Sequence, residues 1–116
     1  MKGKTWSARP RWRVVQGSTI ALGPGKADLL AAIEDEGSIS AAARSLGMSY
    51  RRAWLLVETM NASFRKPLVA TAAFRGKGAS LTREGIEVLR LYREMEERSM
   101  ASTRSSVARL LRLMKE

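Results

Sequence analysis

Apolar residues first recur at helical spacing after residue 25. Leu29, Leu30 and Ile33 share one face of a predicted helix that starts at Lys26. Three acidic residues follow, and Gly37 is a typical C-terminal stop. The acidic cluster should face away from any polyanionic partner.

A second, shorter helix is predicted directly afterwards. Ser38 or Ser40 can cap its start, and Gly47 can end it in a left-handed turn. Three consecutive alanines, residues 41–43, let another helix cross closely. Small residues at such a crossing are what a tight helix-turn-helix requires.

The third predicted helix opens at Met48-Ser49 and cannot run far past Phe64 and Pro67. Its apolar stripe has the spacing of one helix face. The stripe consists of Tyr50, Ala53, Trp54, Val57 and Met60. We expect Trp54 to belong to the core, whereas Tyr50 is ambiguous.

Short β segments flank this helical region. Residues 12–22 predict a strand after a loose basic arm, and Gly23-Pro24-Gly25 breaks it. Residues 68–74 and 79–81 predict a hairpin around a basic glycine turn. Thr82 then caps a last long helix.

The C-terminal helical region carries two apolar stripes, separated by a serine-rich interval at 99–106 that serves as a hinge or a second cap. The first stripe runs from Ile86 to Met95 and the second from Val107 to Met114. Such stripes favour pairing with another chain, although packing back on the same domain is the alternative.

The order of elements predicts a mainly α fold with a small β component: a winged helix-turn-helix with a long C-terminal helix. We divide the chain into a basic arm and strand (1–25), a DNA-binding core (26–82) and a C-terminal helix for dimerisation (83–116).

Charge adds the class of partner. Lys and Arg outnumber Asp and Glu by 21 to 11, for a net charge of +10. Nucleic acid is the first candidate partner and an anionic membrane surface the second. The chain contains no Cys and no His, which excludes thiolate and imidazole metal sites and His-based triads. We therefore expect no enzyme activity, no cofactor and no metal, in a soluble cytoplasmic protein without membrane attachment.

The first turn of the third helix holds the principal DNA candidates. Arg51 and Arg52 follow the Gly47 turn directly, where a recognition helix reaches deepest into the major groove. Arginine can pair bidentately with guanine, and Ser49 and Tyr50 can hold phosphates. The alternative, a solvated arginine pair, is disfavoured by this position.

Further candidates lie in the predicted hairpin and at other positions along the chain. The basic hairpin tip could enter the minor groove or contact the backbone, or could simply be a solvated turn. The tip comprises Arg75, Gly76, Lys77 and Gly78, and the remaining candidates are Ser38, Ser40, Arg44, Arg65, Lys66 and Arg83.

Several of these segments together resemble the DNA-binding domain of the molybdate-dependent regulator (ModE-type) family. The first is Gly37 to Trp54, which ends with the Ser-Tyr-Arg-Arg-Ala-Trp sequence that opens the third predicted helix. The others are residues 58–61, Pro67-Leu68-Val69, Gly76-Lys77-Gly78 and residues 81–85. The LysR-type regulators share the Gly-Ser-x-Ser-x-Ala-Ala and Leu-Thr-x-x-Gly elements.

The resemblance implies a homodimeric transcription factor, joined through its N-terminal strand and final helix, that binds palindromic double-stranded DNA. Family members carry C-terminal oxyanion-binding domains, and the sequence to Glu116 shows none. We therefore expect that the protein binds DNA constitutively, responds to another signal, or depends on a separate oxyanion-sensing partner.

Two other functions fit the same charge. A non-specific architectural nucleic-acid-binding protein needs only the positive field. A protein-interaction or membrane-surface module could use the C-terminal helix, where basic residues border the apolar stripe. The basic residues in question are Arg104, Arg109, Arg112 and Lys115.

Overall fold

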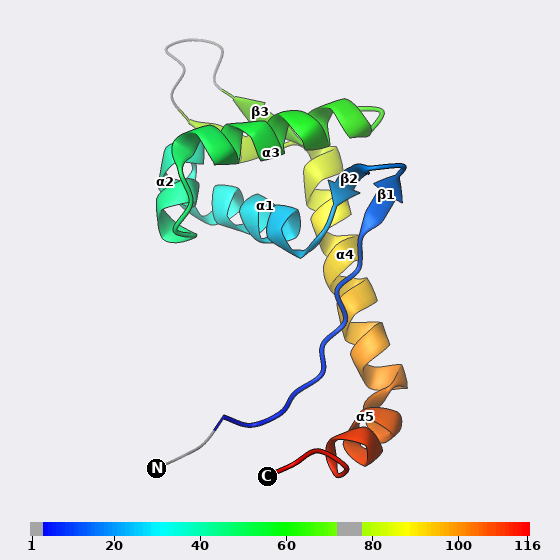
Figure 1. The fold of residues 1–116 in the computed structure, drawn as a ribbon. Coiled ribbons are helices and arrows are strands. Elements are labelled where there is room, and N and C mark those ends of the chain that lie inside the picture. The colour runs from blue at the N-terminus through cyan, green and yellow to red at the C-terminus, as the bar shows by residue number, and fades with distance from the viewer. Residues whose placement is uncertain (1–3, 72–77) are drawn as a thin grey trace.

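The computed structural model describes residues 4–71 and 78–116. Two antiparallel hairpins frame a helical core, and a long helix leads away from it (Figure 1). The elements in chain order are β1 (Val14–Gln16), β2 (Thr19–Leu22), α1 (Pro24–Glu36), α2 (Ile39–Ser45), α3 (Tyr50–Ser63), β3 (Val69–Thr71), β4 (Ala79–Leu81), α4 (Arg83–Ser102) and α5 (Arg104–Leu111). The predicted winged helix-turn-helix, mainly α with a long C-terminal helix, is confirmed.

The N-terminal β segment is a hairpin rather than the single strand that we expected. β1 and β2 pair antiparallel, with Gln16 opposite Thr19. Gly17 has φ +60° and opens the two-residue turn, a conformation that glycine adopts without a steric cost. The Gly17-Ser18 pair was the sequence signal for this turn.

Helix α1 also begins earlier than predicted. Gly23 is its N-cap and Pro24 occupies the first helical position, so the Gly-Pro-Gly segment starts the helix instead of only breaking the strand. Proline suits that position because its fixed φ is helical and the first amides of a helix lack intrahelical partners.

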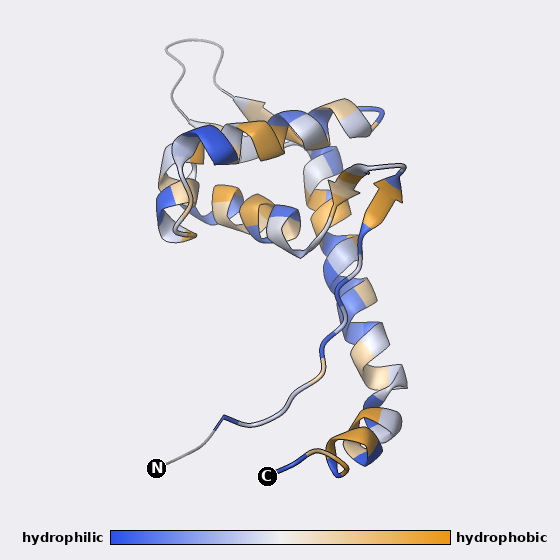
Figure 2. Ribbon diagram, viewed as in Figure 1, coloured by the Kyte–Doolittle hydropathy of each residue, from blue (hydrophilic) through white to orange (hydrophobic). Residues whose placement is uncertain are grey.

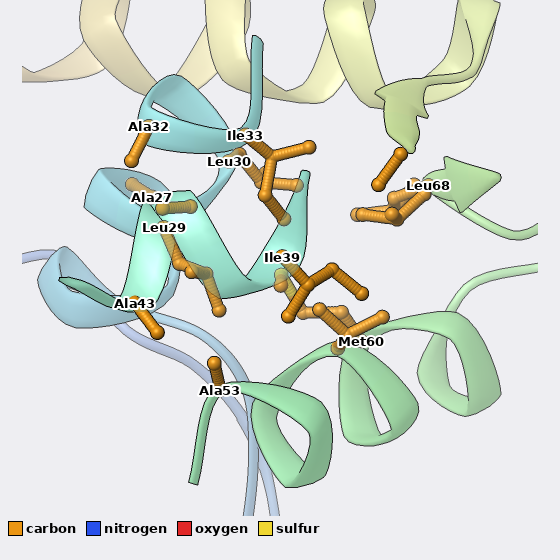
Figure 3. Close-up of a cluster of buried hydrophobic side chains, with 14 of the residues drawn as sticks. Ala27, Leu29, Leu30, Ala32, Ile33, Ile39, Ala43, Ala53, Met60 and Leu68 are labelled. Atoms are coloured by element: carbon orange, nitrogen blue, oxygen red, sulfur yellow. The ribbon is translucent and has the colours of Figure 1, made fainter. Parts of the chain in front are cut away.

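The core lies between α1, α2, α3 and the base of the second hairpin (Figure 3). Leu29, Leu30 and Ile33 of α1 are completely buried. Burying each of these side chains contributes about 1.5–3 kcal/mol. The alanines of α2 bring it close to α3, with Ala42 and Ala43 buried beside the fully buried Ala53.

The second hairpin is attached to the core at its base. β3 and β4 pair antiparallel, with Val69 opposite Leu81. The Asn61 side-chain oxygen accepts hydrogen bonds from the backbone N–H groups of Leu68 (2.8 Å) and Val69 (3.1 Å). The N–H of Ala79 donates to the Gly37 carbonyl at 2.8 Å. These bonds hold the hairpin against both α3 and the α1–α2 junction.

Helix α4 starts at a tight contact with the hairpin. Thr82 caps it by accepting from the Gly85 N–H at 3.0 Å. A Cβ atom on Gly85 would overlap the Leu68 carbonyl oxygen. Only glycine allows this approach, so the predicted cap and the glycine inside the helix start act together.

The N-terminal arm is docked on the C-terminal helices, whereas we had expected it to be loose. The Trp12 indole N–H donates to the Ser99 hydroxyl at 2.8 Å, and the Tyr92 hydroxyl donates to the Trp12 carbonyl at 2.9 Å. Near the chain end, the Trp6 indole N–H donates to the Lys115 carbonyl at 2.7 Å. The two tryptophans thus attach the arm along α4 and α5.

The serine-rich interval separates α4 from α5 at Thr103, whose hydroxyl donates to the Ser99 carbonyl at 2.6 Å. Apolar side chains remain exposed on this region, among them Leu110 and Leu113. Parts of α5 and of the segment after it have the hydrophobic colour in Figure 2. Within the described ranges, none of the helices combines the length and the low polarity that a transmembrane segment requires.

Candidate nucleic-acid interface

The start of α3 is fixed by a cap and a tight turn. The Ser49 hydroxyl accepts from the Arg52 N–H at 3.1 Å, which makes Ser49 the N-cap. Gly47 has φ +68°, and the Met48 N–H returns to the Ala43 carbonyl at 3.0 Å. This left-handed turn connects α2 to α3, and glycine adopts its positive φ with little steric strain. The cap and the turn therefore fix the position of the first turn of α3 relative to α2.

One face of α3 points away from the core. Ala53, Val57 and Met60 are buried, whereas the outward residues are exposed. These outward residues, which we call the outward strip, are Arg51, Arg52, Leu55 and Glu58. Both predicted arginines are thus accessible to a partner, as base contacts would require.

The apolar stripe predicted for α3 is buried only in part. Tyr50 is 52% exposed, and its ring meets that of half-buried Trp54 edge-on, with centroids 6.2 Å apart. The two rings border a groove of about 610 Å³ between the starts of α2 and α3 and the base of the second hairpin. The other residues that line it are Ser38, Ile39, Ser40, Thr71 and Gly78.

Ser38 and Ser40 differ in their surroundings. Ser38 caps α2, since its hydroxyl accepts from the Ala41 N–H at 3.1 Å. Ser40 is exposed and lines the same groove as Tyr50. The predicted candidates Ser38, Ser40, Tyr50 and Gly78 therefore come together around one groove.

Sequence reasoning missed Lys26, which lies close to this cationic region. Its ammonium donates to the Ile20 carbonyl at 2.6 Å. Burial lowers the pKa of Lys26, and the positive charge of Arg52 lowers it further. The two cations are therefore within electrostatic reach of each other, and an anion beside them would relieve their repulsion. Lys26 was only the predicted first residue of a helix, and it approaches Arg52 only in the folded chain. No local sequence pattern therefore identified it as part of this surface.

The basic residues after α3 form a separate group. Arg65, Lys66 and Arg83 border a second groove of about 610 Å³, lined also by Phe64, Leu68, Glu84, Glu87 and Val88. The Lys66 ammonium lies 3.8 Å from the Glu84 carboxylate. Helix α3 has 14 residues, so about 20 Å separate this group from the first turn of the helix.

The remaining candidates lie elsewhere. Arg44 is exposed in the last turn of α2. Gly78 is exposed with φ +85° at the base of the hairpin. Arg75, Gly76 and Lys77 lie outside the described residues, so their predicted contact with DNA stays a prediction.

Fold and site together define the class of protein: a winged helix-turn-helix domain that exposes arginines on its third helix. Within residues 4–71 and 78–116, Asp and Glu form no cluster that could hold a metal ion.

The chain belongs to the lysR family of bacterial regulatory helix-turn-helix proteins, whose model matches residues 26–86. It is 41% identical over 78 residues to the molybdenum transport protein ModE of Azotobacter vinelandii. The matched region covers 66% of this chain and 29% of that protein. It is 43% identical over 86 residues to the molybdenum-pterin-binding protein MopB of Rhodobacter capsulatus, with coverage of 72% and 32%.

A third relative is the DNA-binding transcriptional dual regulator ModE of Escherichia coli K12, 41% identical over 71 residues, which cover 60% of this chain and 27% of the relative. The matches thus span about a third of the length of these curated relatives. The predicted resemblance to ModE-type DNA-binding regions is confirmed.

Proposed function

We propose that this protein is a sequence-specific transcription regulator that binds double-stranded DNA as a homodimer. Helix α3 enters the major groove with Arg51 and Arg52 against base edges. The groove bordered by Tyr50 and Ser40, together with the hairpin, faces the flanking phosphates. The Ser49 hydroxyl, occupied as the cap of α3, supports the helix and reaches a phosphate only as a donor.

One observation carries this proposal: two exposed arginines stand in the first turn of a helix whose opposite face is buried. Such a helix presents its first turn at a fixed angle, and arginine is the side chain best suited to pair with guanine. A non-specific coater needs positive charge but no such fixed arrangement.

Dimerisation is supported by apolar surface outside the helix-turn-helix. Val14, Val15 and Ile20 are exposed on the first hairpin, and Leu110 and Leu113 on the C-terminal region. Helix α4 carries the latter away from the core (Figure 1). A two-fold dimer would bury these side chains and present one α3 to each half-site of a palindrome.

In this proposal the protein acts in the cytoplasm, because its target is the genome. Its role is to bind DNA, and it is not an enzyme. The names of two of these relatives concern molybdenum, and a response of this chain to an oxyanion through a separate partner stays a prediction. Adding molybdate to a DNA-binding assay, with and without cell extract, tests it: a change in affinity only with extract supports the separate partner.

The central experiment selects bound sequences from random DNA and then compares two double variants on the enriched operator. Arg51→Ala with Arg52→Ala should lower operator affinity by about 1–3 kcal/mol for each arginine–base pairing that the change removes. Arg90→Ala with Arg98→Ala removes the same charge from exposed positions of α4, away from the proposed dimer contacts, and is the matched control. Affinity is measured at one fixed salt concentration for operator and for random DNA.

The control pair should weaken both DNAs by a similar and small factor, because only long-range attraction is reduced. The α3 pair should reduce the ratio of operator to random affinity. An unchanged ratio in the α3 pair would contradict base reading by these arginines, and a selection without any enriched sequence would favour the architectural alternative.

A further inference from the structure

Leu55 is an exposed leucine in the middle of the outward strip of α3. Its side chain is 53% exposed, and the buried Ala53, Val57 and Met60 face the other way. The Thr59 hydroxyl, one turn further along α3, donates a hydrogen bond to the Leu55 carbonyl at 2.9 Å, so its proton is used within the helix. The isobutyl group is the apolar part of this surface.

The position of Leu55 places it beside the arginines. A residue four positions after Arg51 lies one turn further along the same face, at a rise of about 6 Å. The major groove is about 12 Å wide, so side chains separated by one turn can reach the same groove. Single exposed leucines are common, but this one lies on the strip that the proposed function turns toward DNA.

The charge along the strip changes sign after Leu55. Arg51 and Arg52 precede it, and the exposed Glu58 follows three residues later. A carboxylate is repelled by phosphates, which limits the region of close approach to the part of α3 before Glu58. Leu55 is therefore the last residue of the outward strip that can lie against the duplex without an opposing charge.

A leucine in the major groove has one apolar partner, the 5-methyl group of thymine. We propose that Leu55 contacts the 5-methyl group of one thymine in each half-site and selects thymine there over the other bases. This inference rests on the proposed function and adds to it the chemistry of one base position. The contact requires no movement of the helix, since the side chain is already exposed.

The test uses the operator from the selection and replaces each thymine singly by deoxyuridine, which removes only the methyl group. The unmodified protein should bind about three- to five-fold more weakly at one thymine per half-site, the equivalent of one buried methyl group. Leu55→Ala should bind thymine and deoxyuridine equally at that position. Leu91→Ala, which shortens an exposed leucine of α4, is the matched control and should keep the original difference.

The possible results separate the two proposals. If Leu55→Ala keeps the thymine preference, or if no thymine is sensitive, the Leu55 contact is wrong while arginine-dependent operator binding still supports the proposed function. If Leu55→Ala changes the oligomeric state and not the thymine preference, Leu55 contacts protein instead, which also overturns the inference. A selection without an enriched sequence overturns both proposals.

Discussion

At the scale of single residues, Asn61 and Gly85 position the second hairpin. The Asn61 amide nitrogen donates to the Val69 carbonyl at 3.1 Å, while its oxygen accepts from two backbone N–H groups. One side chain thus satisfies three backbone groups of the segment that follows α3. Gly85 lets the start of α4 touch the same segment. These two positions hold the base of the hairpin in addition to the pairing of its short strands.

Gly85→Ala should destabilise the fold by about 1–3 kcal/mol, because the added methyl group cannot occupy the space of the Leu68 carbonyl. The control is Gly25→Ala in the first turn of α1, where a Cβ meets nothing within 4 Å. That change should leave stability equal or raise it by up to about 1 kcal/mol. Urea unfolding followed by circular dichroism measures both, and equal midpoints for the two variants would contradict the close contact.

At the scale of elements, the arm and α4 meet at Tyr92. The ring is 1% exposed, and its hydroxyl donates to the Trp12 carbonyl. Burial raises the pKa of Tyr92 above its usual value of 10.0, and the charge of Glu96 acts in the same direction. The folded protein therefore favours the protonated phenol, which alone can donate this hydrogen bond.

The consequence is a loss of stability at alkaline pH. The unfolded chain releases the Tyr92 proton first, so the contribution of this group is complete below about pH 10 and falls as the pH rises toward the folded pKa. Tyr92→Phe should flatten this part of the profile. It should also cost about 0.5–1.5 kcal/mol at neutral pH, because the hydrogen bond to the arm is removed.

Tyr50→Phe is the matched control for this measurement, because Tyr50 is half exposed and lies on α3, away from the arm. Its unfolding free energy between pH 7 and 11 should follow that of the unmodified protein. A Tyr92→Phe profile as steep as the original would show that other groups cause the alkaline loss.

At the scale of the whole molecule, the chain has a compact helix-turn-helix head and an extended region formed by α4, α5 and the arm (Figure 1). Its extents are 56 × 35 × 25 Å. The apolar side chains left exposed on α5 and just after it include Leu110 and Leu113, the latter 83% exposed. An extended element with an uncovered apolar side is what a two-fold interface would use.

Leu110→Asp with Leu113→Asp should shift the proposed dimer toward monomer. Burial of one leucine contributes about 1.5–3 kcal/mol and each change counts twice in a two-fold interface, so the dissociation constant should rise at least about ten-fold. Analytical ultracentrifugation measures this shift. Ser105→Asp puts a charge on the same helix at an exposed polar position and should leave the dimer intact.

Operator affinity should fall in the double leucine variant, since a monomer holds one half-site only. An unchanged dimer in this variant would exclude α5 from the interface. Loss of helical signal beyond α5 would instead reveal a folding role for these leucines, and circular dichroism distinguishes the two results.

The sequence alone determined the helix-turn-helix. Ser38 and Thr82 cap their helices and Gly47 turns the chain as predicted, because each of these interactions lies within four or five residues of its partner. Ser49 was predicted only to open the third helix, and the structure makes it the cap of that helix. Apolar spacing likewise identified the buried faces of α1 and α3. The first hairpin was missed because one strand was assigned across the Gly17 turn.

Only the tertiary structure decided which distant residues meet. The Trp12 indole reaches Ser99 across 87 positions, and Arg52 comes within electrostatic reach of Lys26. The tertiary structure also places Arg65, Lys66 and Arg83 around a groove of their own, apart from the arginines that begin α3. Caps and turns follow from nearby residues, whereas these proximities depend on how helices cross, which is set by the packing of the whole core.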